Sequence, residues 1–285
     1  MSKYGILIPT AYSLIGIFKS DIRPEYGEGD AALGHLLEEI VARSGEVTVL
    51  AWNGKSSSYN SCLPVSLEAY SQPPGSLFHI TNTEMDERVA ALRNSLSRAD
   101  ATLIHDRITR LSPARFGNRR LHLPCIIFTV RQLGIQGVPS EQENHYRARV
   151  SGIGDVDFLT VDRFPLAEPR KLIFVHPWIR ELRDPLDGYT WGSTAEDNAE
   201  SDTESEFCSA PSSSLFAVPA AAMDEYTRAL RLVVRLQQPF HALLLEQQPN
   251  GEFKRVATEH EIVVPGIKRL DNFARDMRTE VVEIL

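Results

Sequence analysis

Apolar residues recur with the period of an α-helix in four stretches of the chain. These stretches are Ala11–Phe18, the residues between Asp30 and Gly45, a segment introduced by Thr83 and Asp86, and Met223–Leu236. Asp30 is a good N-cap and Gly45 a suitable C-terminal stop. Thr83, followed three residues later by Asp86, resembles a capping box. The pattern therefore predicts four helices.

Shorter apolar runs, rich in β-branched and aromatic residues, predict buried strands. These runs are Val47–Trp52, Pro124–Arg131, Tyr146–Val150, Val156–Val161 and Lys171–His176. The clearest hairpin joins Phe240–Gln247 to Glu252–Val264 through Asn250-Gly251, because Asn-Gly favours the turn that matches strand twist. Val281–Leu285 fits either a final strand or the end of a last helix.

Together these elements predict an α+β fold, helix-rich before about residue 140 and strand-rich after it. The loop Gly134–Asn144 is the best internal boundary, and it divides the chain into regions 1–139 and 140–285. The second region holds the hairpin 240–264 and an acidic, serine-rich insert at 187–214. Because this insert has too few apolar residues to order itself, we expect it to be disordered.

The composition predicts a globular protein with a sizeable core, since 42% of the 285 residues are hydrophobic and 24% are charged. No uncharged apolar run is long enough to cross a bilayer, so we expect no membrane partner. Three widely spaced cysteines indicate a reducing compartment, and we predict a cytoplasmic location. The net charge is −8, and six carboxylates lie between Ser193 and Ser214. The remainder is near neutral and lacks the basic footprint of a nucleic-acid binder.

Two charged stretches leave alternatives open. Arg107–Arg120 contains five arginines, which is typical of a solvated surface, with an anion site as the alternative. In the acidic insert, Ser201, Thr203 and Ser205 alternate with carboxylates and suit an acid-directed kinase. The alternative is a solvated linker without modification.

No pattern of histidines, cysteines or carboxylates predicts a metal or a cofactor. None of the eight histidines forms an H-x-x-x-H pair or a zinc-type spacing with cysteine. The catalytic candidates are His105, Asp106 and Cys125 as a nucleophilic set, and Glu28 in the turn Tyr26–Gly29. A buried cysteine on a strand is usually inert. The glycine turn lacks the spacing of nucleotide-binding motifs, so the pattern favours a non-enzyme.

Three groups of residues resemble fungal heterokaryon-incompatibility (HET) domain proteins. The most specific match is Tyr12, Ser13, Leu14, Gly16, Ile17 and Phe18, followed by Tyr26-Gly27-Glu28-Gly29. Val49–Trp52 through Asn60–Pro64 is similar to the downstream region of mushroom-type members. Lys171–Arg180 and the Phe240–Val264 hairpin are similar to that region too.

The resemblance implies the rear portion of such a protein. Only ten residues precede Ala11, whereas family members carry their defining motifs upstream of this helix. We therefore expect an N-terminally truncated paralogue or gene model, to which no catalytic residue of the family can be transferred. The first two helices are expected to bury their apolar faces on strands that the chain does not supply. Self-association, or docking onto a larger protein partner, would follow.

Family members are linked to self/non-self recognition and cell death. Their domain has been compared with Toll/interleukin-receptor-like domains, some of which cleave NAD. The resemblance thus implies a non-catalytic regulatory or interaction region of an incompatibility-type protein. An NAD-cleaving enzyme fragment and a degenerate paralogue without activity are the alternatives.

Overall fold

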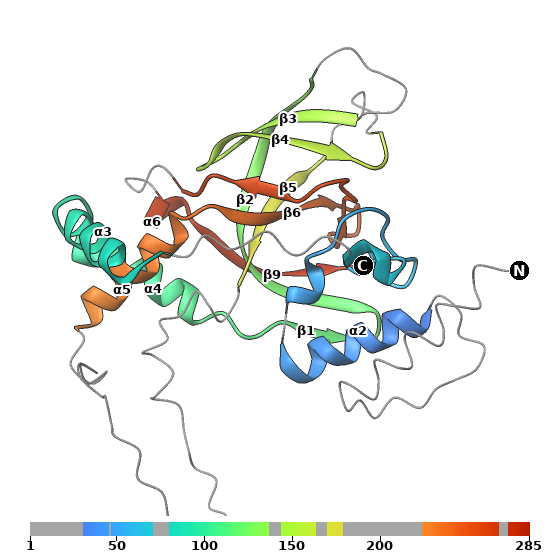
Figure 1. Ribbon diagram of the computed structural model, residues 1–285, viewed down its shortest axis with the longest axis horizontal. Coiled ribbons are helices and arrows are strands. Elements are labelled where there is room, and N and C mark those ends of the chain that lie inside the picture. Colours follow the sequence, from blue (N-terminus) through green and yellow to red (C-terminus); the bar gives the residue numbers. More distant parts are fainter. Residues whose placement is uncertain are drawn as a thin grey trace, which may run out of the picture.

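The longest strand, β2 (Arg120–Ile135), lies at the centre of the fold (Figure 1). The computed structural model describes residues 31–45, 47–70, 80–136, 144–163, 170–178, 224–267 and 273–285. Within them a nine-stranded mixed sheet accompanies the helices, so the predicted α+β class is confirmed. The other elements are α2 (Ala31–Ser44), α3 (Asn82–Ser95), α4 (Arg98–Thr109), β1 (Arg115–Gly117), β3 (Asn144–Val150), β4 (Gly154–Thr160), β5 (Leu172–Pro177), α5 (Glu225–Leu236), β6 (Phe240–Gln247), β7 (Phe253–Arg255), β8 (Ile262–Val264), α6 (Phe273–Asp276) and β9 (Arg278–Ile284).

Strand β2 pairs with different neighbours along its length. Its first half pairs with β1 and β9, its middle also pairs with β5, and its last residues pair with β3. Strand β5 pairs with β6, β6 pairs with β7, and β7 pairs with β9. Because β2 pairs with both β5 and β9, these strands and β2 form a closed ring. The β3–β4 hairpin extends this ring and touches it again at the Thr160–Thr258 bridge.

The expectation of a helix-rich first half is not supported. The run Leu123–Phe128 is buried on both faces of β2, and β2 pairs with β5 and β9 from beyond residue 140. An apolar run buried on both sides is typical of a central strand. The sheet therefore continues across the predicted boundary at 139/140, and the first half supplies its central strand. Residues 187–214 lie outside the described residues.

One face of the sheet is covered by α3, α4 and α5, with α6 beside them (Figure 1). The predicted helix ending at Leu236 is confirmed as α5, which buries Leu230 and Val233. Helix α4 was not predicted, because its buried stripe consists of only Ala101, Ile104 and Ile108. We call this side the helix-covered face.

Helix α3 begins two residues earlier than the capping pattern predicted. The backbone N–H of Glu84 donates to Thr81 Oγ1 at 3.2 Å, and the Glu84 carboxylate accepts from the Thr81 backbone at 3.0 Å. Thr81 with Glu84 is therefore the capping box, and Thr83 with Asp86 is not. Glutamate reaches back to the N-cap backbone, which the shorter aspartate does less well.

The opposite face is covered by α2 and the loop 47–70, and we call it the loop-covered face. The helix predicted between Asp30 and Gly45 is confirmed as α2. Gly45, at φ +65°, ends this helix, and the Gly45 N–H donates to Val41 O at 2.8 Å. Leu33, Leu37 and Val41 share a core cluster with residues of β1, β2 and β9. The expectation that this apolar face needs strands from elsewhere is thus corrected, because the chain's own sheet buries it. The helix predicted at Ala11–Phe18 lies outside the described residues.

The hairpin after α5 follows its predicted turn but not its predicted second strand. Gly251 has φ +90°, as the Asn250-Gly251 turn requires, and β7 pairs with the end of β6. The second strand then breaks, and β8 returns to pair with the beginning of β6. Between them, residues 257–259 hydrogen-bond to the end of β4. The last residues form strand β9, which settles the choice left open by the sequence.

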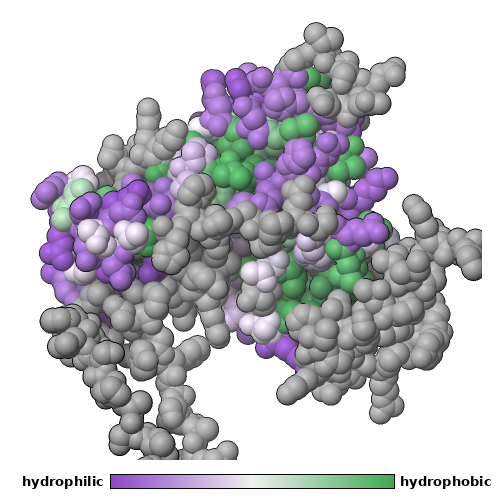
Figure 2. Space-filling model, in the orientation of Figure 1, coloured by the Kyte–Doolittle hydropathy of each residue, from purple (hydrophilic) through white to green (hydrophobic). Residues whose placement is uncertain are grey.

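The outer side of the β3–β4 hairpin is hydrophilic, as the upper part of Figure 2 shows. Arg147 forms a two-pronged pair with Asp157, at 2.7 and 2.8 Å, across the two strands. Arg149 lies 3.1 Å from Asp155 in the next exposed row. Cross-strand pairs of opposite charge suit a solvated sheet face. This surface is therefore neutralised by its own residues.

Candidate functional site

The catalytic residues considered from the sequence are not assembled into one site. His105 and Asp106 lie on α4, over the helix-covered face, with His105 Nδ1 3.8 Å from Asp106 Oδ1. Cys125 belongs to the core of the loop-covered face, so the sheet separates it from α4. Its thiol is fully buried, which raises its pKa and keeps it uncharged. Glu28 lies outside the described residues.

The other site predictions add little to this picture. Ser201, Thr203 and Ser205 lie outside the described residues. Over the part of the chain that the structure describes, no group of three or more histidine, cysteine or carboxylate side chains could hold a metal ion. The run Arg107–Arg120 is distributed over α4 and the β1–β2 hairpin, and Arg107 donates to the carbonyls of Ala274 and Met277 at 2.9 and 3.0 Å.

Buried Arg255, on β7, organises the loop that covers the sheet. Its guanidinium donates to Leu50 O at 2.8 Å and to Trp52 O at 2.9 Å, and lies 3.9 Å from the centroid of the Trp52 ring. Burial lowers its pKa to about 10, so the group remains charged at neutral pH. The prediction of a strand at Val47–Trp52 is wrong. The Arg255 side chain donates hydrogen bonds to carbonyls that would otherwise pair with a neighbouring strand. The segment instead forms a 3₁₀ turn at Thr48–Leu50.

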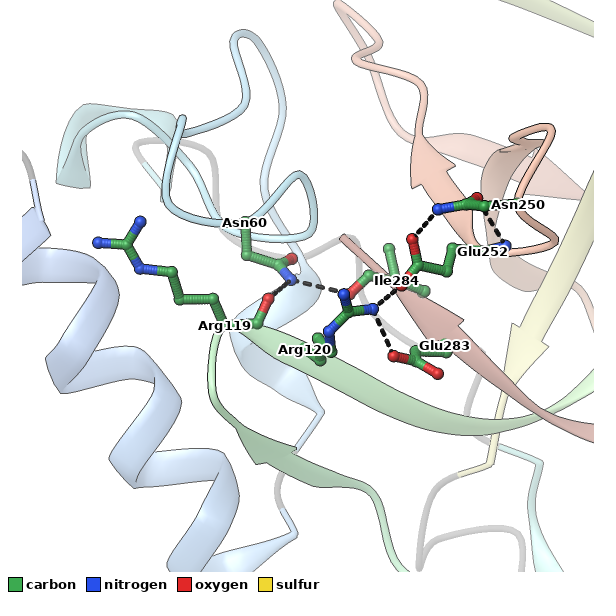
Figure 3. Close-up of polar contacts among 7 residues, drawn as sticks. All are labelled: Asn60, Arg119, Arg120, Asn250, Glu252, Glu283 and Ile284. Atoms are coloured by element: carbon green, nitrogen blue, oxygen red, sulfur yellow. Dashed lines mark hydrogen bonds and ion pairs between the residues drawn. The ribbon is translucent and has the colours of Figure 1, made fainter.

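The next part of the loop ties β9 to the rest of the sheet. Asn60 Nδ2 donates to Ile284 O and to Arg119 O, each at 2.9 Å (Figure 3). The Ser61 N–H donates to Leu285 O at 2.7 Å, and Ser61 Oγ accepts from the Arg255 N–H at 2.9 Å. The Asn60–Ile284 and Ser61–Arg255 bonds connect segments that lie about two hundred residues apart in the chain.

Arg120 completes a polar junction beside Asn60. It forms ion pairs with Glu252 and with Glu283, the latter at 2.6 Å, and Asn250 donates to Glu252 (Figure 3). Glu252 follows the β6–β7 turn and Glu283 lies on β9. We define the polar junction as Asn60, Arg119, Arg120, Asn250, Glu252, Glu283 and Ile284.

Tyr59 links the polar junction to α2. Its hydroxyl donates to the Glu38 carboxylate and lies 3.0 Å from His35 Nδ1. A Cβ on Gly34 would lie 2.4 Å from Tyr59 Cγ, so glycine at this helix position makes room for the ring. Burial, with Glu38 adding to it, raises the pKa of Tyr59. The hydroxyl therefore stays protonated and acts as a donor.

Arg119 occupies a turn that its residue type disfavours. Gly117 pairs with Arg120, and the two residues between them, Asn118 and Arg119, have φ of +54° and +60°. This is the backbone of a two-residue primed turn, where the second position usually holds glycine. The Arg119 guanidinium lies 4.7 Å from the centroid of the Tyr59 ring and points away from Arg120 (Figure 3).

Neither Tyr59 nor Arg255 was indicated by the sequence, and Arg119 was indicated only as one of the five arginines of Arg107–Arg120. One signal was present for Arg119, because Gly-Asn-Arg-Arg between two short apolar runs is turn-like and its arginine is unusual. Arg255 gives a weaker signal, as a charged residue at a position where the strand alternation predicts an inward side chain. Tyr59 gives none, because its partners on α2 are brought to it by the fold.

A second titratable group, His176 on β5, lies in the core of the helix-covered face. Its ring stacks on Phe240, with centroids 4.0 Å apart and planes at 8°. Burial, with a smaller contribution from the nearby His241, lowers its pKa to about 3. Its surroundings are those of a packed core residue.

Two further findings bear on partners and kinship. Among the described helices, none has the length and apolar character needed to cross a membrane. Comparison of the chain with protein-family models, with curated proteins and with solved structures found no match.

Proposed function

We propose that this chain is a non-catalytic regulatory or interaction region of a fungal heterokaryon-incompatibility-type protein, acting in the cytoplasm in self/non-self recognition and cell death. The proposal starts from the Tyr12–Gly29 resemblance. One observation in the structure supports it most. Two segments that resemble the same family, and that are far apart in the sequence, pack against each other.

The contact between these segments is made by Arg255. It belongs to the Phe240–Val264 stretch and hydrogen-bonds to Leu50 and Trp52 in the Val49–Trp52 stretch. Its backbone also donates to Ser61 in the Asn60–Pro64 stretch. Segments inherited together as one structural unit are expected to keep such contacts. Their packing therefore supports a common origin for the two segments.

The dispersal of the catalytic candidates supports the non-catalytic part of the proposal. Nucleophilic catalysis needs the nucleophile and its base within hydrogen-bond reach. Cys125 and His105 lie on opposite sides of the sheet, and burial keeps the Cys125 thiol protonated. Neither residue is placed to serve the other.

The test is an NAD turnover assay on the purified full chain, with an active NAD glycohydrolase as positive control. We expect no saturable NAD consumption. Saturable turnover that a Glu28→Gln variant abolishes would contradict the proposal and favour a Toll/interleukin-receptor-like NAD-cleaving fragment. A His105→Ala variant is assayed beside it, because it removes the other catalytic candidate and leaves Glu28 unchanged.

The interaction part of the proposal includes a protein partner or a second copy of the chain. Phosphorylation at Ser201, Thr203 or Ser205 would add charge to the acidic insert and change such binding. A variant with all three residues changed to alanine is expected to bind the partner with altered affinity when the kinase is present. Unchanged partners and unchanged affinity would contradict this regulatory role.

A further inference from the structure

Arg119 combines an unfavourable backbone with an exposed side chain. Asn118 and Arg119 are both in the left-handed region, which glycine and asparagine adopt readily but in which arginine is strained. Arg119 is exposed, and its backbone carbonyl is fixed by Asn60. Glycine at position 119 would relieve the strain without disturbing this hydrogen bond. The turn therefore carries an arginine for a reason other than backbone stability.

The surroundings of Arg119 orient its guanidinium without neutralising it. One face lies over the Tyr59 ring, which Gly34 and Glu38 hold in place. Among the described residues its contacts are with Tyr59 and Asn60, and none is an ion pair with a carboxylate. Arg120, one residue along, is by contrast paired with two glutamates. A guanidinium that is held by an aromatic ring and has no carboxylate partner among the described residues is suited to bind a carboxylate or a phosphate through two parallel hydrogen bonds.

The charges around Arg119 favour a singly charged ligand group. Glu38 lies beside the Tyr59 hydroxyl, and Glu252 and Glu283 lie in the polar junction. Because these three carboxylates outnumber Arg119 and Arg120, they oppose a phosphate dianion in contact with Arg119 about twice as strongly as a single carboxylate there, and further carboxylates of a ligand must lie away from them. A carboxylate also matches the planar fork of arginine.

We infer that Arg119, stacked on Tyr59, is a binding site for a carboxylate side chain of an acidic peptide segment. The inference deepens the proposed interaction role. It rests on that role because it takes the ligand to be a polypeptide. The acidic segment comes either from a partner protein or from a copy of this chain, whose residues 196–206 carry six carboxylates and no lysine or arginine.

The test is fluorescence anisotropy of the full chain titrated with a labelled peptide of residues 195–207 at low salt. We expect saturable binding that weakens as salt is added, and no binding of a peptide with every Asp and Glu changed to Asn and Gln. Arg119→Gly should weaken binding at least about tenfold. The same substitution should leave thermal stability unchanged or raise it, because it relieves the left-handed strain.

Arg115→Gln is the matched control, because Arg115 is an exposed arginine on the same hairpin. It should leave the affinity within about twofold, since it does not contact Tyr59. Equal losses in both variants would show binding to general surface charge and overturn the site. So would unchanged binding by Arg119→Gly, or the absence of any binding by the parent chain. An Arg119→Gly chain that melts well below the parent would show that the arginine serves stability instead.

Two further titrations separate the ligand classes and sources. A peptide phosphorylated at positions 201, 203 and 205 should bind no more tightly than the parent peptide, and inorganic phosphate should not compete. Tighter binding of the phosphopeptide by about tenfold or more would overturn the carboxylate assignment in favour of phosphate. Changing the six carboxylates of the chain itself should raise its affinity for added peptide if a copy of the chain is the source. No change assigns the source to another protein. All of these outcomes are independent of the NAD assay.

Discussion

The two faces of the sheet are held by different kinds of contact. On the helix-covered face, α3, α4 and α5 bury apolar stripes against the sheet, with residues such as Ile104 and Leu230 fully buried. On the loop-covered face, the chain between Val47 and Tyr70 has little regular structure, and side-chain hydrogen bonds fix it together with its buried apolar residues and backbone hydrogen bonds. Arg255 makes three of these.

The difference separates local from distant information in the sequence. An apolar stripe on a helix is formed by residues three and four positions apart. It can therefore be recognised in the sequence without knowing which residues it packs against. The contacts of Arg255 join residues that are about two hundred positions apart. A buried polar group is stabilising only when every partner is in place. The loop-covered face should therefore respond most to single polar substitutions.

The largest effect is expected for Arg255→Met. The substitution leaves the carbonyls of Leu50 and Trp52 without their donor in a buried position and removes the stacking on the indole. Removal of a desolvated charge offsets part of this loss, so the free energy of unfolding should fall by about 3 kcal/mol. Urea denaturation measures it. Lys254→Met, at the exposed neighbouring position of β7, should change it by less than about 0.5 kcal/mol. Similar values for the two variants would remove the contrast between the faces.

A smaller effect, on the helix-covered face, is expected from pH. His176 has its pKa lowered to about 3 by burial, against 6.5 for the ordinary side chain. Between these values the unfolded chain binds a proton that the folded chain does not, so stability falls as the pH drops below 6.5. The slope is about 1.4 kcal/mol per pH unit, or about 2 kcal/mol lost by pH 5.

The measurement is urea denaturation at pH 7 and pH 5 on the parent chain and on His176→Phe. Phenylalanine can keep the stacking on Phe240 but cannot titrate. The difference in stability between the two pH values should be about 2 kcal/mol smaller in the variant. An identical pH dependence in both chains would show that His176 is accessible to protons in the folded state.

The smallest effect tests the start of α3. Thr81→Ala removes the N-cap acceptor for the Glu84 N–H and should cost about 1 kcal/mol. Thr83→Ala changes the threonine that the sequence pattern pointed to, and it should cost less than about 0.5 kcal/mol. Thermal unfolding of both variants compares them directly. A larger loss of stability for Thr83→Ala than for Thr81→Ala would show that Thr83 is the N-cap, as the sequence pattern predicted.

Much of the helix-covered face could be predicted from the sequence. The periodic stripe of α5, the run Cys125–Val130 and the β3–β4 pair all lie where their patterns indicated. Helix α4 was missed because its exposed Leu103 and half-buried His105 blur the stripe. The loop-covered face was predicted less well. The run Val47–Trp52 is apolar enough for a strand, and only Arg255 decides that it is not one.

The candidate site could not be predicted for the same reason. Arg119 and Tyr59 lie sixty positions apart, and neither belongs to a motif. The residues that chemistry suggested, His105 and Cys125, lie on opposite sides of the sheet. Spacing along the chain identifies sites made by one element, whereas this site is assembled from α2, a loop and a hairpin turn.

Hydrogen exchange of the Arg255→Met chain, read by mass spectrometry, tests the central claim that polar contacts between distant segments hold the loop-covered face. We predict faster exchange at residues 47–70 and 278–285, which Arg255, Ser61 and Asn60 tie together, and unchanged exchange in α4 and α5. Faster exchange to the same extent throughout the chain, or no change at 47–70, would contradict it.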